Sequence, residues 1–163
     1  IDCSGFLFKE KKFKRKVIKE KIDKYNIPFD KIIQLRNGKD IQLDSGENLL
    51  NKNFTKVSKP PKSYAYCSDT RFSSSLASKI KKVDVLYHEA TYCEKHKEIA
   101  ERTGHSTTKE AAKIAKNAKV NRLIIGHYSK RYSELDKLLI ECKEKFDNTF
   151  LANEGDFLDF DTI

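Results

Sequence analysis

The chain has 163 residues, a formal net charge of +9, an isoelectric point near 9.3 and a mean hydropathy of −0.68. This length suits one domain or a large part of one, and no apolar run reaches the roughly 18 residues that a membrane-spanning helix needs, which excludes such a helix. The chain contains no Met and begins at Ile1. Because translation starts with Met, we expect it to be a piece of a longer protein that extends upstream of Ile1.

Positive charge is concentrated near the start of the chain. Between Lys9 and Lys24 there are nine Lys or Arg residues and three acidic residues, a net charge of +6. Apolar side chains recur among them at helical spacing, which predicts an amphipathic helix ending at residues 26–28. A solvated lysine-rich helix and an electrostatic surface for phosphates fit this pattern equally well.

The rest of the chain predicts strands that alternate with helices. Residues 32–56 should form short strands and turns, since Asn37-Gly38 and Ser45-Gly46 are turn signals. The predicted strands beyond the connector 59–62 are 63–67, 83–87, 122–126, 149–152 and 156–160. The predicted helices are 73–81, 94–102, 107–118 and 133–145, and a Thr107–Glu110 capping box begins the third. This alternation is typical of an α/β fold with helices packed on a sheet.

The four cysteines, Cys3, Cys67, Cys93 and Cys142, are far apart in the sequence. No pair has the C-x₂₋₄-C spacing of a structural zinc site, and a disulfide framework would be unusual in a lysine-rich chain of this size. We therefore expect reduced, mostly buried thiols in a cytoplasmic protein.

Polar residues follow three of the predicted strands at the points where they end. Asp69 follows the first, Glu89 the second and His127 the third, while His105 precedes a predicted helix. Because the carboxyl ends of parallel strands share one edge of a sheet, these side chains should converge as a metal or acid–base site. Each also has a structural alternative, such as a helix cap for Asp69 or a lysine partner for Glu89. His88 should face the opposite side of the sheet from Glu89.

These segments, in this order and at these spacings, resemble the ribonuclease Z family, tRNA 3′-processing endonucleases of the metallo-β-lactamase superfamily. The matching segments are Tyr66-Cys67-Ser68-Asp69-Thr70, Tyr87-His88-Glu89-Ala90-Thr91-Tyr92, Gly104-His105-Ser106-Thr107 and His127-Tyr128-Ser129-Lys130-Arg131-Tyr132. The resemblance covers residues 2–160. It implies an α/β fold and a single partial domain over residues 1–163. Residues 63–163 of that domain would form the C-terminal half of a metallo-β-lactamase αβ/βα sandwich.

The resemblance also implies a role for each site residue. Asp69 and His127 would be metal ligands, with Asp69 bridging two Zn²⁺ ions that polarise the phosphate and activate water. Glu89 would orient His105, which would pass a proton to the leaving 3′ oxygen. The chain lacks the family's N-terminal H-x-H-x-D-H motif and the further ligand His that the family carries just before the segment resembling residues 1–6, so five metal-site residues would lie upstream. We therefore expect this chain alone to hold zinc weakly or not at all and not to cleave RNA.

Substrate-binding residues are implied in the same way. Ser129 and Arg131 would contact the substrate phosphate. The basic segment 9–30 takes the place of the family's tRNA-gripping arm, or exosite, although the arm's Gly-Pro-rich element is not matched. The residues expected to bind tRNA there are Lys12, Lys14, Arg15 and Lys16. The complete protein would be a homodimer acting on precursor tRNA, and the half fold would expose a sheet face and edge.

Two other functions fit the same residues. A different metallo-β-lactamase-fold phosphodiesterase would share Asp69 and His127, although the pairing of Glu89 with His105 favours the tRNA enzyme. A non-catalytic RNA-binding domain would use only the basic segment, and its tRNA binding would survive the loss of Asp69 and His127.

Overall fold

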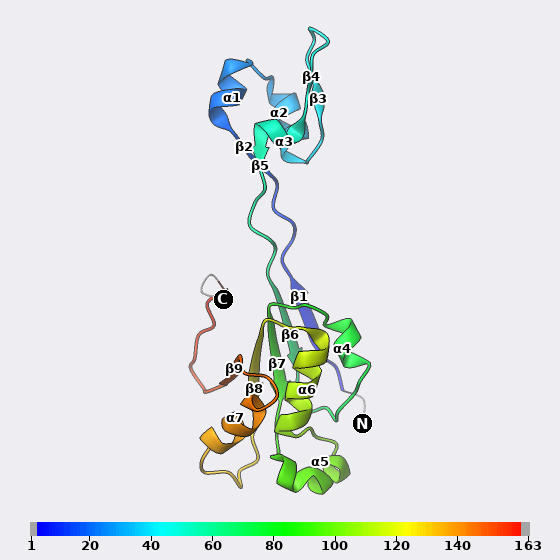
Figure 1. The fold of residues 1–163 in the computed structure, drawn as a ribbon, viewed down its shortest axis with the longest axis vertical. Coiled ribbons are helices and arrows are strands. Elements are labelled where there is room, and N and C mark those ends of the chain that lie inside the picture. Colours follow the sequence, from blue (N-terminus) through cyan, green and yellow to red (C-terminus); the bar gives the residue numbers. More distant parts are fainter. Residues whose placement is uncertain (1–2, 161–163) are drawn as a thin grey trace. The chain divides into compact units, whose positions relative to one another are not determined.

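The computed structural model describes residues 3–160, and the chain divides into two compact units (Figure 1). The sheet unit joins Ile1–Glu10 to Lys62–Ile163, and the basic unit is Lys11–Pro61. The basic unit contains 14 basic and 6 acidic residues (14 − 6 = +8), so it holds nearly all of the chain's net charge of +9. Within residues 3–160, no helix combines the length and apolar character needed to cross a bilayer.

A five-stranded sheet forms the centre of the sheet unit. Its order is β1-β6-β7-β8-β9, with β1 antiparallel to β6 and the other neighbours parallel. The strands are β1 (Phe6–Lys9), β6 (Ser63–Cys67), β7 (Val85–Glu89), β8 (Arg122–Gly126) and β9 (Thr149–Leu151). Because β6, β7 and β8 run the same way, their carboxyl ends lie at one edge, where the predicted site residues follow.

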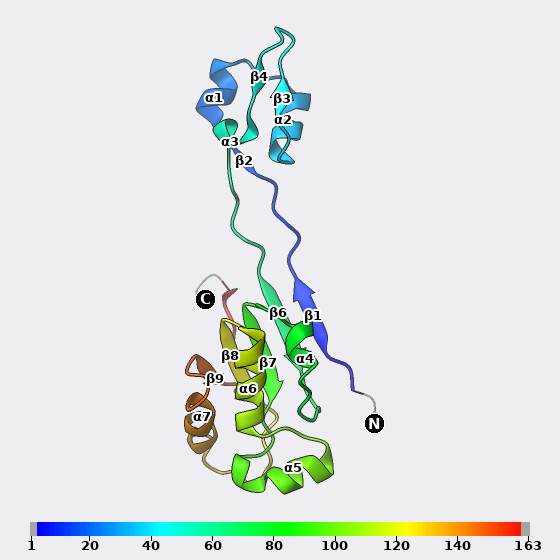
Figure 2. The ribbon, with the colours of Figure 1, turned by 45° about the vertical axis from the view of Figure 1, so that its right-hand side comes forward.

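Helices connect the strands and bury the core of this unit. They are α4 (Leu76–Lys79), the 3₁₀ helix η1 (Glu94–His96), α5 (Lys97–Thr103), α6 (Thr108–Ala118) and α7 (Asp136–Lys143). The predicted capping box is present: Glu110 N–H donates to the Thr107 hydroxyl, and the Glu110 carboxylate accepts from Thr107 N–H. The inner face of α6 is mostly alanine, which lets the helix pack closely on β7 and β8 (Figure 2).

Aromatic side chains populate the sheet outside the buried core. Phe6 and Phe8 on β1 are 56% and 58% exposed, although large apolar side chains are normally buried. Tyr66 and Tyr87 stack with ring centroids 4.7 Å apart. A Cβ at Gly126 would collide with the Tyr87 ring, so glycine is required where β8 ends. The two exposed phenylalanines therefore make part of the surface of β1 apolar.

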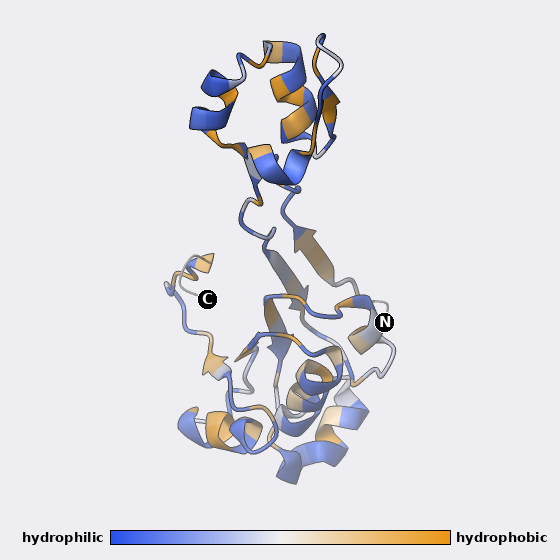
Figure 3. Cartoon of the chain, turned by 45° about the horizontal axis from the view of Figure 1, so that its top comes forward, coloured by the Kyte–Doolittle hydropathy of each residue, from blue (hydrophilic) through white to orange (hydrophobic). Residues whose placement is uncertain are grey.

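The basic unit has its own small core. Its elements are β2 (Lys16–Val17), α1 (Lys19–Lys24), α2 (Phe29–Arg36), β3 (Ile41–Gln42), β4 (Asn48–Leu49), α3 (Asn51–Phe54) and β5 (Thr55–Lys56). The core residues are Ile22, Ile27, Leu35, Ile41, Leu49 and Phe54. Figure 3 shows hydrophobic and hydrophilic residues alternating along its helices. The buried Asn51 side chain donates to the Leu35 and Lys39 carbonyls and so ties α3 to the end of α2.

The helix predicted over residues 9–24 forms only over its last part, Lys19–Lys24. Phe6–Lys9 forms β1 instead, pairing with β6, and a helix begins only at Lys19, after Ile18. Like charges three and four residues apart destabilise a helix, and the backbone finds partners elsewhere: Arg15 N–H donates to the Arg36 carbonyl. Residues 10–18 are therefore not helical, and they still carry much of the positive charge of the basic unit.

Other predicted elements also differ from the structure: the strand predicted at 83–87 is Val85–Glu89, and the helix predicted at 73–81 is only Leu76–Lys79. Residues 29–36 form α2 rather than a strand or turn, because the helix buries Leu35 in the small core. Residues 156–160 form no strand: the Asn153 side-chain amide donates to the Asp156 carboxylate in a turn, and Phe157 is fully exposed. By contrast, the strands predicted at 63–67 and 122–126 are confirmed with their predicted bounds.

Candidate metal and acid–base site

The structure brings the four predicted site residues together at one edge of the sheet. Asp69 lies two residues beyond β6, Glu89 ends β7, His127 directly follows β8, and His105 lies between α5 and α6. Asp69 and His127 have φ angles of 48° and 57°. A non-glycine residue in this left-handed region costs on the order of 1–3 kcal/mol, and such residues cluster at functional sites. The strained backbone turns both side chains into the same space.

The carboxylate of Glu89 is fully buried and organises the surrounding loops. Its Oε1 accepts from Thr70 N–H at 2.6 Å and lies 2.9 Å from His105 Nδ1. Its Oε2 accepts from the Thr91 hydroxyl at 2.6 Å and from Ser106 N–H at 3.1 Å. Four contacts satisfy both oxygens, which compensates the cost of burying the charge. They also place the His105 proton on Nδ1 and leave Nε2 for other chemistry.

Thr91 connects Glu89 to His127. Its hydroxyl has one proton, which it donates to Glu89, so it accepts from His127 Nδ1–H at 2.9 Å. This hydrogen-bond network places a proton on His127 Nδ1, and Nε2 lies 3.1 Å from Asp69 Oδ1. When His127 is neutral, the lone pair of Nε2 faces the carboxylate, an arrangement that a cation between them would stabilise. A partner on the second nitrogen is typical of histidines that bind metals.

The donor set suits a metal ion such as zinc. One carboxylate oxygen of Asp69, one ring nitrogen of His105 and one ring nitrogen of His127 lie within 4.8 Å of one another. The rings of His105 and His127 have centroids 5.2 Å apart. Carboxylate and imidazole are common zinc ligands. His105, expected from the sequence to act as an acid, is thus also close enough to be a ligand.

A hollow of about 570 Å³ opens beside Asp69 and His105, and two arginines line it. Arg71 follows Asp69 by two residues, and Arg102 precedes His105 by three. Sequence reasoning missed both arginines, as well as Thr91. Their closeness in sequence to Asp69 and His105 was the available signal, and guanidinium groups suit phosphate oxygens.

The predicted phosphate-contacting residues are attached to the same network. Ser129 N–H donates to the Thr91 carbonyl at 3.1 Å, and Arg131 Nε donates to the Ser129 hydroxyl at 3.1 Å. The Arg131 guanidinium lies 5.0 Å from the centroid of the Tyr92 ring. The main chain at Ser129 is thus joined to Thr91, and the Arg131 side chain packs on Tyr92, the next residue of that segment.

His88 does not join the cluster. Burial lowers its pKa, its Nδ1 lies 2.7 Å from the Glu89 carbonyl, and its Nε2 has no hydrogen-bond partner. It aligns with the core residues Cys67 and Ile125 on the neighbouring strands. His88 therefore lies on the core side of the sheet and faces away from the Glu89 side chain, as expected from the sequence.

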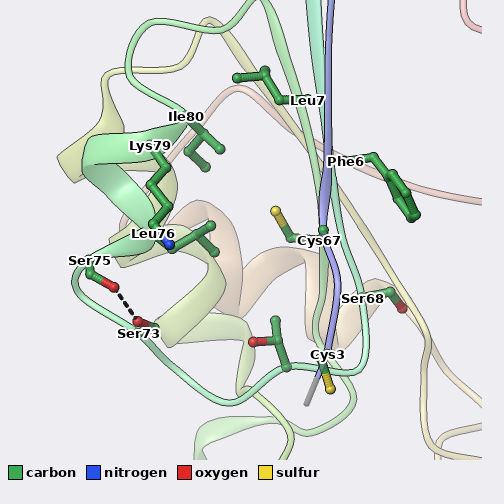
Figure 4. A pocket seen from close by; sticks show the side chains of 12 residues that line it. Cys3, Phe6, Leu7, Cys67, Ser68, Ser73, Ser75, Leu76, Lys79 and Ile80 are labelled. Carbon is green, nitrogen blue, oxygen red and sulfur yellow. Dashed lines mark hydrogen bonds between the residues drawn. The ribbon is translucent and has the colours of Figure 1, made fainter.

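A second hollow, of about 380 Å³, lies beside β1 and α4 (Figure 4) and shares Cys3 and Thr70 with the hollow at the cluster. The apolar side chains of Leu7, Leu76 and Ile80 line it, with Cys67 at its wall. The Ser73 and Ser75 hydroxyls at its rim pair with each other at 2.9 Å. This lining lacks the grouped titratable side chains of the candidate site.

Comparison with known proteins agrees with this geometry. Residues 54–128 match the family described as Beta-lactamase superfamily domain. Ribonuclease Z of Bacteroides fragilis is 42% identical over 155 residues, 95% of this chain and 51% of that protein. Ribonuclease Z of Porphyromonas gingivalis is 44% identical over 154 residues, 94% of this chain and 51% of that protein. The chain thus spans about half the length of these curated relatives.

A solved structure shows the same fold. A metallo-β-lactamase-fold protein of Bacillus subtilis superposes with a TM-score of 0.54 at 23% identity, over 59% of this chain and 39% of that one. The chain therefore has the metallo-β-lactamase fold and resembles ribonuclease Z over about half the length of that enzyme.

Proposed function

We propose that this chain supplies part of the active site of an endoribonuclease that removes the 3′ trailer from precursor tRNA. The observation that carries the proposal is the convergence of Asp69, Glu89, His105 and His127 at one sheet edge. Similarity to ribonuclease Z over 95% of the chain supports the substrate class. The free cysteines of the described residues fit a reducing, cytoplasmic compartment.

Each residue has a defined part in this proposal. Asp69 and His127 would hold Zn²⁺, which when bound polarises the phosphate and activates water. Glu89 holds Nδ1 of His105, so that Nε2 can deliver a proton to the leaving 3′ oxygen. Proton transfer of this kind contributes about 10²–10⁴ in rate. Arg131, near the cluster, would neutralise charge on the phosphate.

The proposal places two zinc ions in the complete enzyme. Among residues 3–160, the grouped ligands are the three side chains Asp69, His105 and His127, fewer than two ions require. We therefore propose that the remaining ligands come from the half of the fold that this chain does not cover. The complete enzyme would be a homodimer, in which the basic unit of one subunit holds the tRNA cut in the other; the ribonuclease Z resemblance supports this arrangement.

A chimera tests the proposed function. The half of the Bacteroides fragilis relative that this chain does not match would be joined ahead of residue 1, and the chimera compared with the 163-residue chain. We expect the chimera to cleave a precursor tRNA at its trailer and the chain alone to show no cleavage.

Two results would contradict the proposal. A folded chimera that hydrolyses bis(p-nitrophenyl) phosphate but leaves the trailer intact would indicate a different phosphodiesterase. A chimera that binds tRNA without cutting it, with binding unchanged by Asp69→Ala, would indicate an RNA-binding domain. Circular dichroism and gel filtration would establish that each protein is folded.

The basic unit contains the surface proposed to bind tRNA. A hollow of about 600 Å³ is lined by Phe13, Lys14, Arg15, Lys16, Val17, Arg36, Ser58 and Lys59. Arg15 Nε donates to the Thr55 hydroxyl at 2.6 Å, which fixes one guanidinium at its wall. Five cations around one hollow suit a phosphate backbone, and the exposed Phe13 ring could stack on a base.

Replacing Lys12, Lys14 and Lys16 by Gln in the chain should weaken tRNA binding and flatten its salt dependence. The plot of log K against log salt has a negative slope. Each phosphate that is no longer neutralised by a lysine should reduce the magnitude of this slope by about 0.7–0.9. Titration of labelled tRNA at several salt concentrations measures both quantities. The matched control replaces the exposed Lys81, Lys116 and Lys119 of the sheet unit, with the same change in net charge. Equal slopes for the two triple variants would contradict the assignment.

A further inference from the structure

Cys93, His96 and Tyr132 form a cluster that the proposed RNA cleavage does not use. Cys93 precedes η1, His96 ends it, and Tyr132 follows the segment that carries Ser129 and Arg131. Cys93 Sγ lies 3.4 Å from His96 Nδ1 and 3.3 Å from the Tyr132 hydroxyl. His96 Nδ1 lies 2.6 Å from the same hydroxyl. A thiol, an imidazole and a phenol thus meet at one point.

The hydrogen bonds of the cluster suit a sulfur that loses its proton. As a thiol, Cys93 can donate to His96 Nδ1. As a thiolate, it can accept from the Tyr132 hydroxyl, and that hydroxyl in turn accepts from protonated His96 Nδ1. Burial raises the pKa of Tyr132 to about 12, so its phenol keeps the proton that it donates. A cysteine beside a base is the usual arrangement of a nucleophilic thiol.

The sulfur is also next to open space. Cys93 is half-buried and lines a hollow of about 330 Å³ together with Arg131, Tyr132 and Lys137. The other thiols have different surroundings. Cys67 and Cys142 are buried, and burial raises the pKa of their thiols to about 11 and about 12. Cys3 is exposed, and its Sγ donates to the Asp69 carbonyl at 2.6 Å.

We propose that Cys93 is a thiol–disulfide exchange site for low-molecular-mass disulfides, with His96 as its base. His96 Nδ1 takes the thiol proton, and the Cys93 sulfur attacks one sulfur of the disulfide. A Cys93–S–S–R bond forms as the S–S bond of the reagent breaks, and the leaving thiolate takes up the proton as RSH. Electrons balance within the disulfide reagent, so no other oxidant is needed.

The adduct has a structural consequence within the same cluster. Both the Cys93 sulfur and the Cys93 N–H contact the Tyr132 hydroxyl, the N–H at 3.0 Å. A group added to the sulfur extends into the adjoining hollow and changes the hydrogen bond between the sulfur and that phenol. This reactivity does not depend on the proposed RNA cleavage.

The test measures thiol exchange in the folded 163-residue chain carrying Cys3→Ser. Dithiobis(nitrobenzoate) is an aromatic disulfide whose leaving group, thionitrobenzoate, absorbs visible light, so stopped-flow absorbance reports the rate at pH 7. We expect one thiol to react at least tenfold faster than glutathione, with the adduct on the peptide that contains Cys93 by mass spectrometry. Cys93→Ser should abolish the fast phase, and His96→Gln should slow it at least tenfold.

Further variants separate reactivity from folding. Tyr132→Phe removes one donor to the sulfur and should slow the fast phase severalfold, which gives a second test if His96→Gln does not fold. Lys97→Gln, an exposed neighbour, is the control and should react at the parent rate. In urea, all variants that retain Cys93 should react alike. A parent rate no faster than glutathione, a fast adduct on Cys67 or Cys142, or a folded His96→Gln that reacts at the parent rate would overturn the proposal.

Discussion

Replacing His105 by Asn in the chimera should lower precursor tRNA cleavage by about 10²–10⁴-fold, the usual contribution of a general acid. Asn at this position cannot deliver a proton, whereas the buried carboxylate of Glu89 would still be satisfied by Thr70, Thr91 and Ser106. Single-turnover kinetics with a trailer-bearing substrate measures the effect. The matched control is His96→Asn, which changes a histidine outside the group Asp69, Glu89, His105 and His127. Its cleavage rate should stay within about threefold of the parent rate.

Metal analysis of the same variant distinguishes the two possible roles of His105. If His105 is the acid, zinc content should be unchanged while cleavage falls, and the pH–rate profile should lose its basic limb. Zinc content that falls in parallel with cleavage would instead make His105 a ligand. Cleavage at the parent rate would exclude both roles.

Replacing Asp69 or His127 by Asn should remove zinc binding from the 163-residue chain. We expect the parent chain to bind no more than one Zn²⁺, and weakly, because the grouped ligands of the described residues are Asp69, His105 and His127. Isothermal titration with Zn²⁺ and elemental analysis give the affinity and the stoichiometry. Tight binding of two ions by the chain alone, with RNA turnover, would contradict the half-site assignment.

A variant of Thr91 tests whether its hydroxyl orients His127 for binding a metal ion. Thr91→Val keeps the shape of the side chain but removes the hydroxyl that accepts from His127 Nδ1–H. Loss of such a partner typically lowers metal affinity 10–100-fold. The same titration measures it, and Ser78→Ala, an exposed hydroxyl change on α4, is the control. Equal affinities for Thr91→Val and the parent would mean that the hydroxyl does not orient His127.

Local sequence signals predicted the sheet unit well. β6 and β8 are short runs of β-forming residues bounded by polar residues, and α6 begins with a capping box, so their bounds follow from neighbouring residues. The convergence of Asp69, Glu89 and His127 followed from parallel strand order, because that order places the strand ends together.

Long-range contacts explain what the sequence could not predict. The helix expected over residues 9–24 forms only over Lys19–Lys24, because Lys9 pairs with β6 and Lys16–Val17 pair with β5, both far away in the chain. The bridge that Thr91 makes between Glu89 and His127 depends on side-chain orientation, which spacing does not specify. Arg71 and Arg102 became candidates once their position in one hollow was known.

The uneven distribution of charge between the two units gives the proposed enzyme a particular response to its ionic surroundings. The basic unit carries +8 and the sheet unit the remaining +1. Attraction of a polyanion is screened by dissolved ions, whereas hydrogen bonds to a fully buried carboxylate are not. Raising potassium chloride should therefore raise the substrate concentration needed for half-saturation while leaving the rate of the saturated complex nearly constant.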